Sequence, residues 1–149
     1  MISIFRLSSA KFPANSGVGA ANFGGRWNPI GTPVIYAAQT ASLAALEVLV
    51  HFSVLPRDFV LTEINVPENL AVTTWEAALL PVGWNGDVVT SETQELGAKW
   101  VREARAALLS VPSSIIPSER NFILNPAHPV FRRIKFLPSV PFAFDPCLK

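Results

Sequence analysis

The sequence is poor in cysteine and histidine. It contains one cysteine, Cys147, and two histidines, His51 and His128, in 149 residues. A single cysteine cannot form an intramolecular disulfide, which is typical of a protein from a reducing compartment. There is also no His-x-x-x-His or Cys-x-x-Cys spacing, so we expect no metal site.

Charge and long apolar runs are also scarce. Only 15% of the residues are charged and the net charge is +1, which gives no strong field toward a polyanion, so we expect no direct nucleic-acid partner. The most apolar stretch, residues 33–50, is interrupted by polar residues such as Gln39 and Glu47 and is unsuited to a membrane span of about 20 residues. The first residues show no basic region followed by a long apolar run, so we expect no secretory signal. We expect a cytoplasmic protein without a membrane partner.

What the sequence does contain is enough apolar material for a core. Half of the residues are hydrophobic, and a chain of this length predicts one domain over residues 1–149. The 13 prolines are spread along the chain, and there is neither a low-complexity linker nor an internal repeat.

The pattern of elements predicts an α+β fold with short mixed strands and two main helices. One helix is predicted over residues 41–52, after the N-cap residue Thr40, and is apolar almost all round, so it should be buried. The other is predicted over residues 92–109, where Ser91 and Gln94 have the spacing of a capping box. Strands are predicted over residues 2–7, 33–37, 59–66, 70–75, 113–116, 120–124, 130–137 and 140–144.

The most unusual stretch is the glycine-rich segment 16–29, with four glycines before Arg26. Glycines allow close approach of the backbone to a ligand, and an arginine suits phosphate. An ordinary turn, whose arginine binds a carbonyl or a surface acid, is the alternative. The segment matches neither a Rossmann fingerprint nor a P-loop, because no helix is signalled after the glycines and no Gly-Lys-Ser/Thr follows.

Glu47 is a second candidate because it lies within an apolar helix. Burial of a carboxylate is costly unless it is paired, so such a residue often has a function. The alternative is a narrow solvated stripe, since Thr40, Ala44, Glu47 and His51 fall on one side of the helix. The polar cluster of residues 111–126, rich in serine, asparagine and proline, is a third candidate, with ordinary strand-ending turns as the alternative. No Gly-x-Ser-x-Gly elbow is present, which disfavours an ester or peptide hydrolase.

Taken in order, these segments resemble the RES domain, a family named for an Arg, a Glu and a Ser. The resemblance begins at Phe5-Arg6 and spans nearly the whole chain. It rests on Gly24-Gly25-Arg26-Trp27-Asn28-Pro29, Val34-Ile35-Tyr36-Ala37, Ser42-Leu43-Ala44-Ala45-Leu46-Glu47 with His51, Val111-Pro112-Ser113, and Asn121-Phe122-Ile123-Leu124-Asn125-Pro126. It implies an ADP-ribosyltransferase-like fold and the toxin of a type II toxin–antitoxin pair, with an Xre-like helix-turn-helix antitoxin.

Residue by residue, the resemblance makes Arg26, Glu47 and Ser113 the catalytic candidates. The serine could also be Ser114 or Ser118 if the alignment slips. The expected NAD-binding residues are Arg26, Tyr36, Asn28 and Asn121, and Asn125 is a further pocket candidate.

The implied activity is cleavage of the nicotinamide–ribose bond of NAD, with no cofactor beyond that substrate. Because this reaction creates an oxocarbenium-like ribose, the Glu47 carboxylate would stabilise the positive charge. Arg26 would bind the diphosphate or the adjacent ribose, Tyr36 would stack on nicotinamide, and Ser113 would fix the ribose or the Arg26 loop.

Three questions stay open at the level of sequence. Water, inorganic phosphate or a protein could accept the ADP-ribose, and the last case would make the protein an ADP-ribosyltransferase. A non-catalytic binding partner of a helix-turn-helix regulator is an alternative of another class. Whether the chain forms a homo-oligomer is also open.

Overall fold

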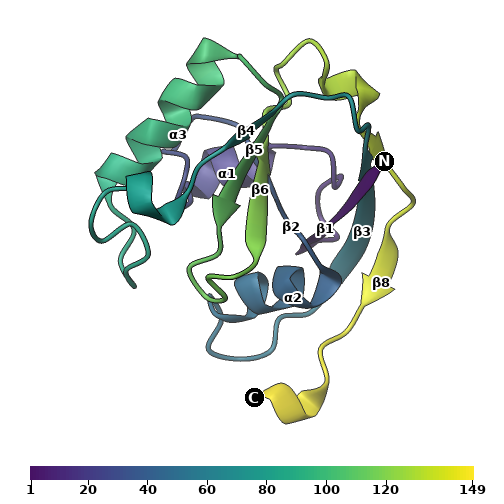
Figure 1. Cartoon of the computed structure of the whole chain (residues 1–149). Helices are drawn as coiled ribbons and strands as arrows, with labels where there is room; N and C mark the ends of the chain where they lie inside the picture. Colours follow the sequence, from purple (N-terminus) through teal and green to yellow (C-terminus); the bar gives the residue numbers. More distant parts are fainter.

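Eight short strands form one mixed β-sheet in the computed structural model, which describes all 149 residues. The strands are β1 (Ile2–Ser9), β2 (Ile35–Ala38), β3 (Phe59–Val66), β4 (Val72–Thr74), β5 (Leu108–Pro112), β6 (Arg120–Leu124), β7 (Lys135–Phe136) and β8 (Val140–Phe142). The helices are α1 (Val18–Phe23), α2 (Ala41–Leu49) and α3 (Ser91–Glu103), with short 3-10 turns at Ala77–Leu79, Phe131–Arg133 and Pro146–Leu148. The predicted α+β class is confirmed (Figure 1).

The sheet is nearly divided between β1 and β2. Its strand order is β4-β5-β6-β2-β1-β3-β7, with β8 also on β3, and all pairs are antiparallel except β4 with β5. β1 pairs with β3 along its whole length, and β2 pairs with β6 over its four residues. β1 and β2, however, pair only at Phe5 and Ala38. The two halves of the sheet therefore separate on either side of this point.

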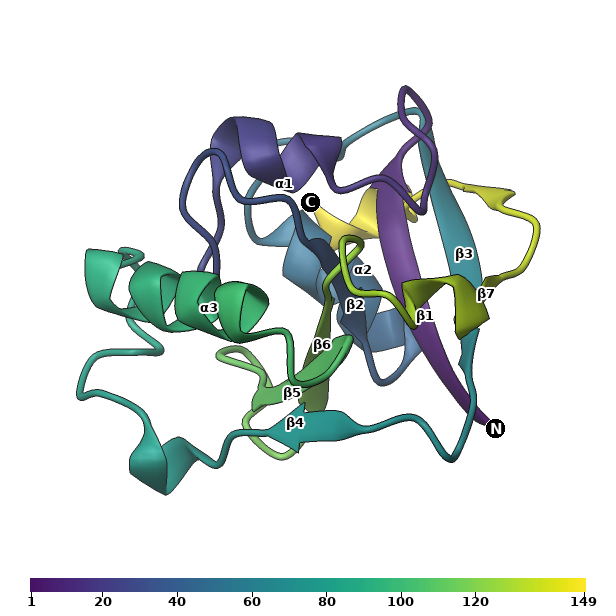
Figure 2. The same cartoon turned by 90° about the horizontal axis from the view of Figure 1, so that it is seen from above.

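Helix α2 packs against both β1 and β2, next to the place where they part (Figures 1 and 2). Leu43, Ala44 and Leu49 of this helix are buried in a cluster with Leu7 of β1 and Ala38 of β2. The Thr40 hydroxyl caps its first turn by accepting a hydrogen bond from Leu43 N–H, as the sequence predicted. The helix ends at Leu49, three residues before the predicted end.

Helix α3 lies on the other half of the sheet (Figure 2). Its Trp100 packs in a second apolar cluster with Trp27, Leu109 and Ile123. The predicted capping box is wrong, because Thr90, not Ser91, is the N-cap residue and accepts from Thr93 N–H.

The end of α3 also differs from the prediction. The helix stops at Glu103 because Ala104 adopts a left-handed conformation with φ of 49°. Leu108 and Leu109, predicted as the last residues of the helix, instead begin the fully buried strand β5. The strand predicted over residues 113–116 is wrong, because these residues form the turn after β5.

Other predictions for the chain have mixed outcomes. The strands over residues 59–66 and 120–124 are confirmed at both ends. Residues 130–137 contain a 3-10 turn and only a two-residue strand. Helix α1 was not predicted. It has only six residues and is flanked by Gly17 and Gly24, so the sequence shows no helical periodicity there. No helix of the protein has the length and apolar character needed to cross a membrane.

Candidate active site

A cavity of about 680 Å³ opens where β1 and β2 part. Its lining comes from β1, α1 and the glycine-rich segment, β2, α2, and the ends of β5 and β6. Figure 2 shows α1, α2, β1 and β2 gathered around this region. The charged or titratable side chains among the lining residues are Arg6, Arg26, Tyr36, Glu47 and His51.

Glu47 is held by two side chains that come from distant parts of the sequence. The Ser113 hydroxyl donates to Glu47 Oε2 over 2.9 Å, and the Asn121 amide nitrogen donates to the same oxygen. Glu47 Oε1 receives no hydrogen bond from the protein. The carboxylate is thus fixed at one oxygen and free at the other, which excludes the alternative of a merely solvated helix stripe.

Ser113 is a positioning residue for Glu47. Its side chain is fully buried, and its oxygen accepts hydrogen bonds of 3.0 Å from the backbone N–H groups of Ile115 and Ile116 while its proton goes to Glu47. A hydroxyl has one proton and two lone pairs, so Ser113 has no capacity left for a ligand. The hydrogen bonds of Ser113 thus go to Glu47 and to its own turn, and its expected contact with the ribose or the Arg26 loop stays a prediction. Ser114 lines the cavity and Ser118 is exposed.

Arg26 lines the cavity but is already engaged with the chain. Its Nη1 donates to Trp84 O over 2.6 Å and its Nη2 to Gly86 O over 3.0 Å. Trp84 in turn stacks on Trp27 with ring centroids 6.3 Å apart. Arg26 therefore holds the segment around residues 84–86 against the glycine-rich loop by two hydrogen bonds. Its third guanidinium nitrogen, Nε, has no protein partner.

Tyr36 and Asn28 together fix the shape of the Arg26 loop. The Tyr36 hydroxyl donates to Asn28 Oδ1 over 2.6 Å and accepts from Trp27 N–H over 3.0 Å. Burial raises the pKa of Tyr36 above its ordinary value, an effect opposed by the Trp27 N–H bond and by the charge of Arg26. The Tyr36 ring lines the cavity, while its hydroxyl has an internal role.

Asn28 does not reach the cavity. Its side chain is 0% exposed, and its amide nitrogen donates to the carbonyl oxygens of Ala20 and Thr32 over 2.9 and 3.0 Å. Every polar atom of its amide is used inside the protein, and the contact with NAD expected for Asn28 stays a prediction. Asn125 is likewise buried, and its oxygen accepts from Ala127 N–H.

Two glycines are required by close contacts around this loop. A Cβ atom on Gly25 would lie 2.6 Å from the Tyr36 hydroxyl oxygen, and one on Gly97 would overlap the carbonyl oxygen of Trp27. Gly97 lies in α3, and Gln94 of the same helix donates to Gly25 O over 3.1 Å. Helix α3 therefore packs against the loop that carries Arg26 and holds it in place.

Arg6 is a site residue that the sequence reasoning missed. It lies on β1 and donates through Nη1 to Tyr36 O over 2.9 Å, across the gap between β1 and β2. No carboxylate pairs with it, and burial lowers its pKa to about 10. The available signal was a charged residue inside the apolar strand 2–7, the same kind of anomaly that drew attention to Glu47.

The protein contains three buried side-chain polar atoms without a hydrogen-bond partner, and they all belong to cavity residues. They are Arg6 Nε, Ser8 Oγ and Asn121 Oδ1. Such atoms are rare in folded proteins and call for an explanation. The cavity is therefore the part of the protein where the chain leaves its buried polar side chains least satisfied.

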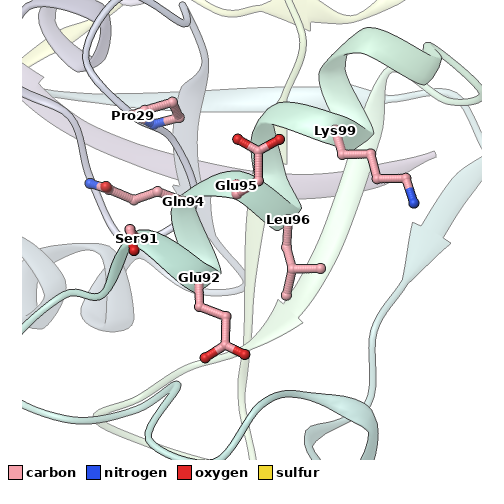
Figure 3. A pocket seen from close by; sticks show the side chains of 7 residues that line it. All are labelled: Pro29, Ser91, Glu92, Gln94, Glu95, Leu96 and Lys99. Atoms are coloured by element: carbon pink, nitrogen blue, oxygen red, sulfur yellow. The ribbon is translucent and has the colours of Figure 1, made fainter.

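A second hollow lies beside α3 and is lined by Pro29, Ser91, Glu92, Gln94, Glu95, Leu96 and Lys99 (Figure 3). Figure 3 shows Gln94 directed toward the segment that carries Pro29, whereas Lys99 points away from it. Of the predicted site residues, none lies here. No group of three or more His, Cys, Asp or Glu side chains is arranged to hold a metal ion.

The family model for the RES domain matches residues 3–145. The chain belongs to the RES domain family. It is 40% identical over 147 residues to a protein named Toxin Res from Photorhabdus laumondii, covering 95% of this chain and 94% of that one. It is also 40% identical over 135 residues to a protein named Prs ADP-ribosylating toxin from a Sphingobium strain, covering 88% of this chain and 84% of that one.

The fold is similar to that of a chain from the solved M. tuberculosis MbcT–MbcA toxin–antitoxin complex. The TM-score is 0.76 with 24% sequence identity, over 99% of this chain and 86% of that one. At this identity the similarity concerns the fold. The RES resemblance predicted from the sequence is confirmed by the family match and by these relatives.

Proposed function

We propose that this RES protein is the toxin of a toxin–antitoxin pair and that it cleaves the nicotinamide–ribose bond of NAD. The observation that carries the proposal is the charge pattern of the cavity. It combines one fixed carboxylate, Glu47, with two arginines, Arg6 and Arg26. NAD has the complementary pattern, a cationic nicotinamide riboside joined to an anionic diphosphate.

Glu47 is suited to stabilise the positive charge that develops on the ribose. Two donors hold Oε2 in place, and Oε1 is free to face the sugar. Nicotinamide leaves as a neutral molecule from a cationic ring, so the bond can break without a general acid.

The arginines are suited to the diphosphate. Arg6 has no internal counter-ion, and its Nε has no partner, so an anion would offset the cost of its burial. Arg26 would contribute its charge while holding the segment 84–86. Tyr36 would form one wall of the nicotinamide site with its ring.

The test is to incubate the purified protein with NAD and to measure free nicotinamide, with and without inorganic phosphate. We expect release by the wild type and a loss of about 100-fold or more in Glu47→Gln, since an electrostatic stabiliser of this kind contributes on that order. Glu95→Gln on the exposed face of α3 is the matched control and should retain full activity. Absence of nicotinamide release by folded wild-type protein under both conditions would refute the proposal.

Transfer of ADP-ribose to a protein is the second candidate, favoured by the name of the Sphingobium relative. It uses the same bond cleavage but a different acceptor. Incubation of the protein with labelled NAD and a bacterial lysate separates the two, because transfer places the label on a discrete protein band whereas cleavage leaves it on free ADP-ribose or its phosphate.

The antitoxin partner, which we propose to be an Xre-like helix-turn-helix protein, should abolish nicotinamide release when the two proteins are co-purified. A non-catalytic role makes the opposite prediction for the toxin alone. Growth arrest by an Arg6→Ala, Glu47→Ala double variant would favour a binding module, since both charges proposed for catalysis are then absent.

A further inference from the structure

The turn that follows β6 contacts the C-terminal end of α3. It spans residues 125–130, and it lies next to this end of the helix at the top of Figure 1. His128 Nε2 lies 2.9 Å from Ala104 O, and the Asn125 amide nitrogen donates to Val101 O over 3.4 Å. Both carbonyl groups lie at the end of α3, where a helix supplies no partner of its own. The turn therefore caps α3 from outside the helix.

The hydrogen bonds of His128 determine which of its ring nitrogens carries the proton. Nδ1 accepts from Val130 N–H over 3.2 Å, so the proton of the neutral ring is on Nε2, which donates to Ala104 O. Ala104 has a left-handed backbone with φ of 49°, which is unfavourable for a residue other than glycine. The bond from His128 thus holds the end of α3 in a conformation that Ala104 does not favour by itself.

The same turn contacts the glycine-rich segment that carries Arg26. A Cβ atom on Gly17 would lie 3.3 Å from Pro126 Cγ, so the proline ring packs against the start of this segment. Near the other end of the segment, α3 contacts the carbonyl oxygens of Gly25 and Trp27. The turn therefore touches the start of the segment directly and its end through α3.

Helix α3 moves as one body because backbone hydrogen bonds join its 13 residues. A shift of its C-terminal end along the helix axis must also move Gly97. This glycine lies so close to Trp27 O that a Cβ atom there would overlap the oxygen. Close-packed groups transmit such a shift, so the loop must follow the helix.

We propose that His128 is a positioning residue for Arg26: its bond to Ala104 O fixes α3 along its axis, and α3 fixes the loop that presents Arg26 to the diphosphate. The part played by Arg26 rests on the proposed function, whereas the link from His128 to the loop does not. Glu47 is held by Ser113 and Asn121, outside this connection. The effect of His128 therefore falls on binding of the diphosphate and not on bond cleavage.

Two substitutions at residue 128 separate the bond to α3 from the rest of the turn. Glutamine places its amide nitrogen near the position of Nε2, so His128→Gln keeps a donor for Ala104 O. Asparagine is shorter and places its oxygen near the position of Nδ1, so His128→Asn keeps the acceptor for Val130 N–H and loses the donor. Arg132→Gln is the matched control, because this side chain is exposed just after the turn.

The measurements are the kinetics of nicotinamide release and the binding of an uncleavable ligand. That ligand is carbocyclic NAD, in which a methylene replaces the ring oxygen of the nicotinamide ribose. In His128→Asn we expect the KM for NAD and the Kd of carbocyclic NAD to rise about tenfold, with kcat within about threefold of the wild type. The Kd of carbocyclic nicotinamide riboside, which lacks the diphosphate, should change by less than about twofold. His128→Gln and Arg132→Gln should stay within about threefold of the wild type in every quantity.

A spectroscopic signal reports on the loop without any ligand. Trp27 of the loop stacks on Trp84, and this pair contributes to the near-ultraviolet circular dichroism. We expect the near-ultraviolet spectrum to change in His128→Asn and to be retained in His128→Gln and Arg132→Gln. Far-ultraviolet circular dichroism checks that each variant folds.

Several results would overturn the role of His128. They are an unchanged KM and near-ultraviolet spectrum in folded His128→Asn, equal losses in His128→Gln and His128→Asn, or a fall in kcat alone. If His128→Asn does not fold, Asn125→Ser takes its place, because it removes the bond to Val101 O and its hydroxyl can still accept from Ala127 N–H. It should raise the same KM and Kd by about threefold, and no rise would again overturn the role.

The outcome is separable from that of the proposed function. Weaker binding of carbocyclic NAD by His128→Asn, in a protein that releases no nicotinamide, refutes the proposed reaction and supports the role of His128. Nicotinamide release by the wild type without a difference among the variants refutes the role of His128 alone. If the wild type neither binds carbocyclic NAD nor cleaves NAD, the proposed function is refuted, and the near-ultraviolet spectra decide whether His128 holds the Arg26 loop.

Discussion

At the scale of single residues, Arg6 carries a positive charge inside the protein without a carboxylate to balance it. Its only hydrogen bond goes to the carbonyl oxygen of Tyr36, and burial lowers its pKa to about 10. A buried and unpaired charge is unfavourable for folding, which agrees with the diphosphate-binding role that we propose for Arg6.

Arg6→Met should therefore separate stability from activity. The methionine retains much of the apolar stem and removes the desolvated charge, so we expect the free energy of unfolding to stay constant or to rise by about 1 kcal/mol. Nicotinamide release should fall by about 100-fold. Denaturant titration and the nicotinamide assay measure the two effects, and a variant that is strongly destabilised would show that Arg6 is part of the scaffold instead.

Tyr36→Phe tests whether the ring or the hydroxyl of this residue matters. The change leaves Trp27 N–H without its acceptor and Asn28 Oδ1 without its donor, so we expect a loss of about 1–3 kcal/mol in unfolding free energy. If the ring alone served the site, activity would survive. Because the hydroxyl shapes the loop that carries Arg26, we expect nicotinamide release from NAD to fall as well. The KM for a truncated substrate that lacks the diphosphate should change little, because the diphosphate is the group proposed to bind Arg26.

The same hydroxyl predicts a pH dependence of stability. Burial raises the pKa of Tyr36 in the folded protein above its value in the unfolded chain. Its contribution to stability is present below the unfolded pKa of about 10 and is lost as the pH rises above that value, because only the unfolded chain then ionises. Unfolding measured between pH 8 and about 11 should show a steeper loss in the wild type than in Tyr36→Phe; parallel curves would contradict this.

At the scale of elements, two helices position the site from opposite directions. Helix α2 carries Glu47 to the gap between β1 and β2, and α3 contacts the Arg26 loop through Gly97 and Gln94. The cap at Thr40 and the apolar surface of α2 were evident in the sequence. The contact of α3 with Trp27 was not, because it depends on two segments about 70 residues apart.

Gly97→Ala should damage activity from a distance. A methyl group at this position overlaps the carbonyl oxygen of Trp27, so α3 or the loop must move, and we expect a loss of about 3 kcal/mol in stability. Gly19→Ala is the matched control, since its methyl group meets nothing within 4 Å in α1, and helix propensity predicts a gain of about 0.5–1 kcal/mol. Equal thermal stability of Gly97→Ala and the wild type would exclude the close contact.

At the scale of the whole molecule, ligand binding should tie the two halves of the sheet together. A ligand that contacts β1, α2 and the loop around Arg26 bridges the place where β1 and β2 have only one pair of facing residues. Carbocyclic NAD at 100 times its dissociation constant should stabilise the fold by about 2.7 kcal/mol. For a domain of this size that corresponds to a rise of about 5–10 °C in Tm. Thermal unfolding with and without the ligand measures the shift, and an unchanged Tm at saturation would contradict it.

The sequence by itself determined the class of the fold, the strands 59–66 and 120–124, the cap of α2 and the family. These features depend on local patterns and on ordered motifs, which one chain displays directly. Glu47 stood out for the same local reason, as a carboxylate in an apolar helix. The sequence could not tell an accessible polar residue from a buried one, so Asn28 and Ser113 were expected to bind the ligand.

Only the tertiary structure decided which of these residues face the cavity and which have their hydrogen bonds inside the protein. It placed Asn28 and Ser113 in the interior, engaged Arg26 with the carbonyl groups at residues 84 and 86, and brought Arg6 to the cavity. The physical reason is that hydrogen-bond saturation and burial depend on partners far away in the sequence. Ser113 and Asn121 lie 66 and 74 residues after Glu47 in the sequence. The three meet because β5, β6 and β2 are neighbours in the sheet and α2, which carries Glu47, packs against β2.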